Sequence, residues 1–557
     1  MAREVDTPSA GFAAPLRYPI YRRIWIASVL SNLGFLIQGV GAAWAMTQLT
    51  SSIGLVALVQ AASMLPILLW ALPAGAIADM YDRRIVSMIA LSIALVSAAA
   101  LATVSYLGWL TPWLLLGFCF TVGSGIALYA PSWQASVTEQ VPNHVFPAAV
   151  ALNSISYNIA RSFGPAIGGL IVATAGAGAA FVTNAIFYIP LLLVLYLWKR
   201  DVEPPRLPPE QLGRAVISGA RYVTNTPVMR TVLARCLLTG VIGGSVPALM
   251  PLIARDLIGG GASTYGLLLG CFGLGAVGGA LAVSRIRQRG DDERWIRIAT
   301  AILGISILVA ATSASGPRTG LALLVSGGAW TLSVALFNIG MQLSAPRWVA
   351  GRALAAFQAA VAGGVAVGSW GWGSLADTLG ISEALLASGL AMLLSPLAGR
   401  WLPMPQFNGP NAHADDPPAD PDVKLAITSR SGPIVIEAEY EVDPAEARAF
   451  YLVMQDVQRM RQRNGAYGWT LARDIADPRI WTERFHCPTW LDYLRQRSRA
   501  TKAELELQQN AIRFHTGTRP IRIRRKLERP MGSVRWREET PDRAPSGLAV
   551  PISPTGT

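Results

Sequence analysis

The sequence predicts an all-α, multi-pass membrane protein that ends in a small α+β unit, and three observations predict this class. Of the 557 residues, 52% are hydrophobic and 15% are charged, a profile typical of polytopic membrane proteins. About twelve apolar runs occupy residues 22–403, each long enough for a bilayer that needs roughly 20 apolar residues. Beyond residue 404 the chain becomes rich in Arg, Asp, Glu and Pro and shows strand-like alternation.

The apolar runs divide into two groups of equal number, because the longest polar break within the membrane part falls in the middle. The predicted spans are 22–48, 52–78, 85–107, 110–137, 145–174, 178–198, 231–255, 263–286, 295–314, 319–345, 352–378 and 381–402. The predicted domains are a six-helix half at 1–198, a linker with an amphipathic helix at 199–230, a second six-helix half at 231–403, a flexible linker at 404–423, an α+β domain at 424–540 and a disordered tail at 541–557.

The basic residues of the loops predict the orientation. With the N-terminus inside, most short connections that carry Arg or Lys lie on one side, and the opposite side holds only Arg255 and Arg318. Loops rich in Lys and Arg stay in the cytoplasm. We therefore expect a plasma or inner membrane protein whose N- and C-termini are both cytoplasmic.

Composition also excludes several classes of function. The net charge of +13 comes from the connections and the tail, so we expect no nucleic-acid partner. Four cysteines without a CxxC pair and four histidines outside the spans predict neither a metal site nor another cofactor. The chain has no GxxxxGK[ST] segment, which disfavours an ATP-driven pump.

A charged residue interrupts the predicted span 145–174. A charge at the bilayer centre costs about 2.5–3.5 kcal/mol on insertion scales, so Arg161 predicts a helix that faces a water-filled cavity. Just beyond it, Gly164, Pro165, Gly168 and Gly169 would allow close helix approach and local bending. The alternative is an arginine that snorkels or joins two helices.

The two halves carry an apparent internal repeat. Gly164, Gly169 and Gly176 match Gly368, Gly373 and Gly380 at one constant spacing, and a second block aligns Gln134 with Gln342. Repeated halves with a substrate site between them are typical of secondary transporters. The alternative is chance similarity among Gly- and Ala-rich helices.

Polar side chains inside the spans are the candidate substrate ligands, because an unpaired amide in hydrocarbon is costly. Each could instead form a hydrogen bond between helices. The candidates are Asn32, Gln38, Gln134, Arg161, Gln342 and Gln358.

The connection between the second and third spans carries Gly75, Asp79, Arg83 and Arg84. This pattern resembles the G-x-x-x-D-x-x-R-R loop of the major facilitator superfamily. With the order of further blocks such as LPAGAIADMYDRR and SAPRWVAGRALAAFQ, the chain is similar to the enterobactin-exporter-like branch, the transmembrane secretion effectors. The alternative is a plain positive-inside turn.

The resemblance implies the major facilitator fold and export by alternating access. It implies a latch at Gly75, Asp79 and Arg83 that holds the outward-open state, and a moving interface at Gly164, Pro165, Gly168 and Gly169. Proton coupling comes from the resemblance alone, because no basic residue precedes Gly123-Ser-Gly125, where proton-coupled drug exporters carry an arginine.

The tail predicts a compact strand-helix-strand-strand-helix-strand unit of the ferredoxin-like type. Its expected strands are 433–442, 467–475, 479–487 and 521–528. The unit resembles the antibiotic-biosynthesis-monooxygenase-like module, which implies binding or dimerisation rather than catalysis, since no catalytic carboxylate pair is evident.

The sequence thus predicts a secondary active transporter, not an enzyme, that exports a small hydrophobic or siderophore- or antibiotic-like molecule through the bilayer. Two alternatives stay open: a membrane-anchored enzyme, or a ligand sensor that acts through the C-terminal domain.

Overall fold

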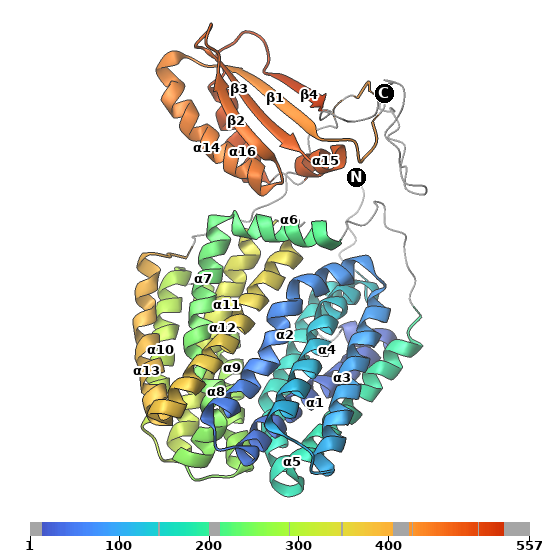
Figure 1. Ribbon diagram of the computed structural model, residues 1–557, viewed down its shortest axis with the longest axis vertical. Helices are drawn as coiled ribbons and strands as arrows, with labels where there is room; N and C mark the ends of the chain where they lie inside the picture. The colour runs from blue at the N-terminus through green and yellow to red at the C-terminus, as the bar shows by residue number, and fades with distance from the viewer. Residues whose placement is uncertain are drawn as a thin grey trace.

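The protein consists of a bundle of long helices and a small sheet domain (Figure 1). The computed structural model describes residues 14–142, 145–199, 212–288, 290–346, 349–404, 421, 423–425, 427–498 and 501–528. The predicted linker 404–423 lies almost entirely outside these residues, and the predicted tail 541–557 lies wholly outside them.

The bundle contains two groups of helices that lie side by side (Figure 1). The first group comprises α1 (Pro19–Leu49), α2 (Ile53–Met80), α3 (Arg83–Tyr106), α4 (Pro112–Ser136) and α5 (Phe146–Leu197). The second group comprises α7 (Pro227–Gly243), α8 (Ser245–Leu252), α9 (Ala262–Arg287), α10 (Asp292–Ala311), α11 (Gly316–Ser344), α12 (Ala350–Leu379) and α13 (Ile381–Leu394).

Eleven helices of the described chain are long and apolar enough to cross a membrane, against the expected twelve or so. The difference comes from α5, whose 52 residues join the predicted spans 145–174 and 178–198. Gly176 interrupts this helix with a φ of 81°, a conformation that glycine adopts without the steric cost of a Cβ. The junction therefore contains a sharp break but no loop.

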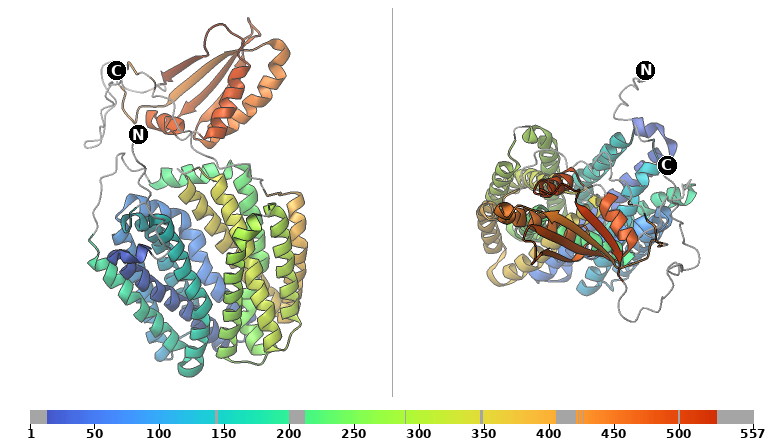
Figure 2. Two further views of the ribbon diagram at one scale, coloured as in Figure 1. Left: turned by 180° about the vertical axis from the view of Figure 1, so that it is seen from behind. Right: turned by 90° about the horizontal axis from the view of Figure 1, so that it is seen from above.

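The two ends of the bundle differ. The predicted amphipathic helix of the linker is present as α6 (Leu212–Thr224), which lies between the bundle and the sheet domain. Figure 2 shows the same order from behind. We call the end of the bundle that lies next to α6 the domain end. The opposite end, where α1 connects to α2 at residues 50–52, we call the distal end.

The two groups meet along α5 with α9 and along α2 with α12. At the first contact, a Cβ on Gly169 would lie 2.7 Å from Gly266 Cα and 2.8 Å from the Ala262 carbonyl oxygen. At the second, a Cβ on Gly373 would lie 2.4 Å from Ala57 Cβ. Both contacts bring helices together at a distance that a larger side chain would prevent.

The C-terminal domain contains the predicted strands and helices. They are β1 (Ile434–Glu441), α14 (Ala447–Arg463), β2 (Tyr467–Arg473), β3 (Ile480–Cys487), α15 (Trp490–Ser498), α16 (Lys502–Arg513) and β4 (Arg522–Leu527). The sheet is antiparallel with the order β2-β3-β1-β4. Phe450, Met454 and Phe485 are fully buried in its core, so a small C-terminal sheet domain is confirmed.

Candidate functional site

A large cavity of about 700 Å³ lies between the two helix groups. Residues of α1, α2, α4 and α5 form one wall, and the first turns of α12 form the other. Most lining side chains are apolar, as is usual for sites that bind small molecules. Its polar side chains are Asn32, Ser63, Gln134, Tyr157, Arg352 and Gln358.

The large cavity extends to the domain end of the bundle. Its lining includes Ala78 in the last turn of α2, Ala135 in the last turn of α4 and Gly351 in the first turn of α12. In the opposite direction it reaches Phe35 and Ser63, near the middle of α1 and α2. The large cavity therefore extends from the domain end, near α6, to about the middle of the bundle.

The distal end is sealed by contacts between the groups. The Asp377 carboxylate, at the end of α12, accepts hydrogen bonds from the backbone N–H groups of Ile53 (2.7 Å) and Gly54 (2.9 Å) and from Ser52 Oγ (3.2 Å). These donors form the N-terminus of α2, where a negative charge is favourable. Arg255 Nη1 donates to the Thr47 carbonyl oxygen at 2.7 Å and reinforces the seal.

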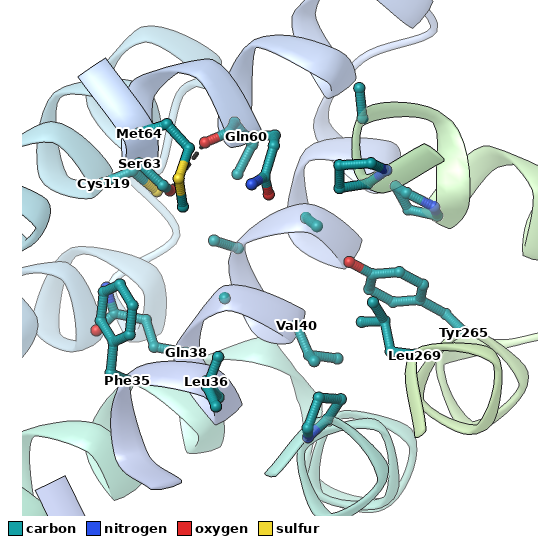
Figure 3. A pocket seen from close by; sticks show the side chains of 18 of the residues that line it. Phe35, Leu36, Gln38, Val40, Gln60, Ser63, Met64, Cys119, Tyr265 and Leu269 are labelled. Carbon is teal, nitrogen blue, oxygen red and sulfur yellow. Dashed lines mark hydrogen bonds between the residues drawn. The ribbon is translucent and has the colours of Figure 1, made fainter. Parts of the chain in front are cut away.

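A smaller cavity of about 160 Å³ adjoins the large one, with which it shares Phe35, Ser63 and Met64. Figure 3 shows the side chains of Gln60 and Tyr265 pointing into it. Since Gln60 belongs to α2 and Tyr265 to α9, the smaller cavity also lies between the groups.

The structure brings together three of the predicted substrate ligands. Asn32, Gln134 and Gln358 all line the large cavity, although they come from α1, α4 and α12. Asn32 Nδ2 also lies 3.4 Å from Ser156 Oγ, an interhelical contact with α5.

The other three lie elsewhere. Gln38 lines the smaller cavity, and its Oε1 accepts a hydrogen bond from Asn184 Nδ2 at 2.5 Å. Gln342 is exposed and donates to Asn338 Oδ1, one turn earlier on α11. Arg161 is not among the residues that line either cavity. It is half-buried on α5, with its guanidinium 5.7 Å from the Phe272 ring centroid of α9.

Sequence reasoning missed Arg352, the one charged residue among the described lining of the large cavity. The signal was its helical spacing: Arg352, Ala355 and Gln358 recur at three-residue intervals and share one face. Because Arg352 lies near a span end, it is indistinguishable by position from an ordinary positive-inside arginine.

The predicted latch residues lie at the domain end. Gly75 lines the large cavity. Arg83 Nη1 donates to Glu139 Oε1 at 2.9 Å and to the Ala135 carbonyl oxygen at 2.8 Å, which joins the start of α3 to the end of α4. Asp79 belongs to the last turn of α2, but its side chain lies outside the described residues. These hydrogen bonds of Arg83 thus stay within the first helix group.

The predicted moving interface at Gly164, Pro165, Gly168 and Gly169, here called the glycine-proline element, contacts two other helices, α1 and α9. A Cβ on Gly164 would lie 3.0 Å from Leu36 Cβ, and one on Gly168 would lie 3.1 Å from Ile37 Cα, both on α1. Gly169 instead meets α9 at Gly266, where the Pro165 carbonyl oxygen would lie 2.7 Å from an added Cβ. The element therefore borders both a contact within the first group and a contact between the groups.

Long apolar helices in two groups, with a cavity between them, are typical of multi-pass membrane transporters, and the family match and relatives below are of the major facilitator (MFS) type. The chain belongs to the transmembrane secretion effector family, whose signature matches residues 10–531. The relatives found are transporters, so the expectation that the protein is not an enzyme is confirmed.

Two relatives of this chain are transporters with different names. The multidrug efflux pump Tap of Mycolicibacterium fortuitum is 26% identical over 390 residues, which are 68% of this chain and 95% of Tap. The staphyloferrin A transporter of Staphylococcus aureus is 26% identical over 284 residues, which are 51% of this chain and 71% of the transporter.

Solved structures share the fold. The nucleoside transporter NupG has a TM-score of 0.55 at 11% identity, over 69% of this chain and 98% of NupG. A bacterial homolog of the human lysosomal transporter Spinster, in an inward-facing and occupied conformation, has a TM-score of 0.57 at 13% identity, over 69% of this chain and 97% of that chain.

Proposed function

We propose that the protein exports a small, largely apolar molecule from the cytoplasm by alternating access, and that the structure represents its inward-facing state. One observation carries this proposal: the large cavity reaches the domain end, whereas Asp377 and Arg255 join the groups at the distal end. In such a carrier, cargo enters from one side and the groups then rock to expose it to the other.

The assignment of the domain end to the cytoplasm rests on its arginines. Lys and Arg accumulate in cytoplasmic connections. The helix ends at the domain end carry Arg22, Arg23, Arg83, Arg84, Arg285, Arg287, Arg352 and Arg400. Both termini would then be cytoplasmic.

We also propose that the two groups are duplicated six-helix halves, with α5 crossing the membrane twice to give twelve crossings. Gly176 and Gly380, matched in the sequence repeat, both have positive φ, 81° and 105°. Gly169 and Gly373 are matched as well, and each contacts a helix of the opposite group. A duplication explains why both features occur twice.

For the cargo, we propose a siderophore- or antibiotic-like compound with hydrogen-bonding oxygens and an anionic group. Three amides in an apolar chamber suit such a molecule, and Arg352 takes the role that we expected of Arg161. The names of the two relatives, a multidrug efflux pump and a staphyloferrin A transporter, agree with this class. Proton coupling and placement in the enterobactin-exporter-like branch rest on the family resemblance.

The C-terminal domain is, in this proposal, a ferredoxin-like module of the antibiotic-biosynthesis-monooxygenase type. Its element order and its sheet order β2-β3-β1-β4 support that assignment. Dimerisation through this module is part of the proposal.

Counterflow in proteoliposomes tests the function. The purified protein is reconstituted with an imposed pH gradient, and uptake of a cationic dye (ethidium), an anionic dye (carboxyfluorescein) and a catecholate siderophore is followed. We expect gradient-dependent movement of at least one anionic probe. Saturable binding of the probes without movement of any of them would contradict the proposal.

A further inference from the structure

The C-terminal domain encloses a cavity of its own, with a volume of about 150 Å³. We call it the domain cavity. It lies between the inner face of the sheet and helices α14, α15 and α16, and Ile436, Met460 and Phe485 supply part of its apolar wall. A dry apolar cavity of about 150 Å³ can hold one benzene ring, so the volume suits a single-ring compound.

Two amide groups in the wall lack a good acceptor. Gln496 is 7% exposed, and its Oε1 accepts from the Cys487 thiol at 3.2 Å. Its Nε2 has no hydrogen-bond partner in the described part of the chain. The partner found for Gln508 Nε2 is the Met460 sulfur at 3.7 Å, a weak acceptor. Because a buried donor normally finds a partner, Gln496 Nε2 points to an oxygen acceptor on a ligand, and the half-buried Gln508 offers a second donor.

The charges around the domain cavity favour an anion. Arg461 and Arg497 both line it. Glu504 is the only carboxylate in its described lining, and Glu504 Oε1 already accepts a hydrogen bond from Arg463 Nη2 at 2.6 Å. Arg461 Nε donates to the fully buried Glu483 at 3.1 Å. The described lining therefore contains two arginines and one carboxylate.

We propose that the domain cavity binds a second small molecule, a single-ring aromatic carboxylate or a compound of similar shape, and that α6 transmits its occupancy to the large cavity. This site is distinct from the transport cavity. The inference about binding is independent of the proposed transport function, whereas its effect on transport rests on that function.

The first link in the transmission is the contact between the domain and α6. Glu504, in the wall of the domain cavity, accepts hydrogen bonds from both Arg463 and Asn464, the latter at 3.0 Å. Arg463 in turn places its guanidinium 5.4 Å from the ring centroid of Tyr222 on α6, and Tyr222 is only 3% exposed. A bound carboxylate that repels or displaces Glu504 would therefore alter the contact of Arg463 with α6.

The second link is the contact between α6 and α12. A Cβ on Gly219 of α6 would lie 2.5 Å from Arg352 Cδ and 2.9 Å from Arg352 Cβ. Tyr222 also belongs to a buried apolar cluster that includes Ala353 and Phe357 of α12. Since Arg352 lines the large cavity, α6 contacts the ligand-facing turn of α12 directly.

Binding is tested on the full-length protein in nanodiscs, with benzoate as the probe and benzamide as its neutral counterpart. Isothermal titration should show saturable benzoate binding that is about tenfold tighter than that of benzamide, as expected for one charge-assisted hydrogen bond. Gln496→Leu should weaken binding by about tenfold, and Met460→Trp, which fills the cavity, should abolish it. Gln462→Leu, an exposed glutamine on α14, is the control and should bind as the wild type does.

Transmission is tested by hydrogen exchange of residues 212–224 with and without benzoate, a readout that needs no transport. Benzoate should change the exchange of α6 in the wild-type protein and in Arg459→Gln, a control on the exposed face of α14. The change should be lost in Arg463→Gln and in Tyr222→Ala.

Two results would overturn the proposal. Absence of saturable benzoate binding, or equal binding by Met460→Trp, would eliminate the site. Normal binding with unchanged exchange of α6 would eliminate its connection to the large cavity. Both results leave the counterflow experiment unaffected, so failure of this inference is distinguishable from failure of the proposed function.

Discussion

The distal end and the domain end of the bundle differ in how the two helix groups meet. At the distal end, Asp377 accepts from the backbone of α2, and Gly169 brings the backbones of α5 and α9 together. At the domain end, the groups diverge around a cavity of about 700 Å³, and α6 contacts α12 through the Arg352 side chain. The difference shows that the contact between the groups at the distal end depends on a few residues. Single substitutions of these residues can therefore test whether the contact matters for transport.

The largest effect is expected from Gly169→Leu. Its side chain would collide with backbone atoms of α9, since even a Cβ would lie 2.7 Å from Gly266 Cα. We expect the distal end to stay open and counterflow to fall by about a hundredfold, in line with the cost of overpacking a tight contact. Gly117→Leu is the matched control, because nothing lies within 4 Å of a Cβ there.

Counterflow and distal accessibility to a membrane-impermeant thiol reagent should be measured together. Full transport by a correctly folded Gly169→Leu protein, as judged by size-exclusion chromatography, would contradict a closure that depends on this contact.

The second expected effect compares two arginines. Arg352→Gln should reduce counterflow of an anionic probe by about tenfold or more, because a hydrogen bond to a charged group contributes about 1.5–3 kcal/mol. Arg161→Gln should have a smaller effect, since Arg161 packs on Phe272 and does not line the large cavity. The measurement is the initial rate of counterflow of carboxyfluorescein (anionic) and ethidium (cationic) by each variant. A larger loss in Arg161→Gln than in Arg352→Gln would indicate that Arg161, not Arg352, interacts with the anionic probe.

These two arginines also indicate what can be predicted from sequence. Apolar runs locate the spans, because bilayer thickness sets their length. The repeat of Gly169 and Gly373 points to close helix contacts. The environment of Arg161 depends on Phe272, a residue of another helix far along the chain, and the role of Arg352 depends on where α12 begins. Side-chain environments of this kind come from tertiary packing, which no local pattern reveals.

The third expected effect is a weakened seal in Asp377→Asn. The amide keeps its size but loses the charge that accepts from the N-terminus of α2. Since Asp377 is exposed, we expect a loss of about 1 kcal/mol or less, or up to about fivefold in the ratio of inward- to outward-facing protein. Accessibility of a cysteine at the distal end measures this ratio. Glu383→Gln, at the start of α13, is the control and should leave it unchanged.

The smallest expected effect concerns an exposed pair on the sheet of the C-terminal domain. The hydrogen bond from Lys526 Nζ to Glu437 Oε2, 2.6 Å long, holds the pKa of Glu437 below its usual range. A lowered folded-state pKa contributes stability above the unfolded pKa, and this contribution is lost as the pH falls through the folded value. Lys526→Met should therefore destabilise the domain at pH 7 by about 0.5 kcal/mol or less.

Thermal unfolding of this variant at pH 7 and pH 3, followed by tryptophan fluorescence, provides the measurement. The difference from the wild-type protein should shrink toward pH 3, because the carboxylate of Glu437 takes up its proton as the pH falls through its lowered pKa. A difference that grows at pH 3 would contradict the assigned sign.

The central claim is that the distal end must open during each transport cycle. A disulfide between the two sides of the seal tests it most directly, because Ser52 Oγ lies 3.2 Å from Asp377 Oδ2. In a background where the native cysteines are replaced, Ser52→Cys combined with Asp377→Cys is oxidised, and counterflow is measured before and after reduction, with each single variant as control. We predict that oxidation stops counterflow and that reduction restores it. Undiminished counterflow by the fully oxidised protein would contradict alternating access through the distal end.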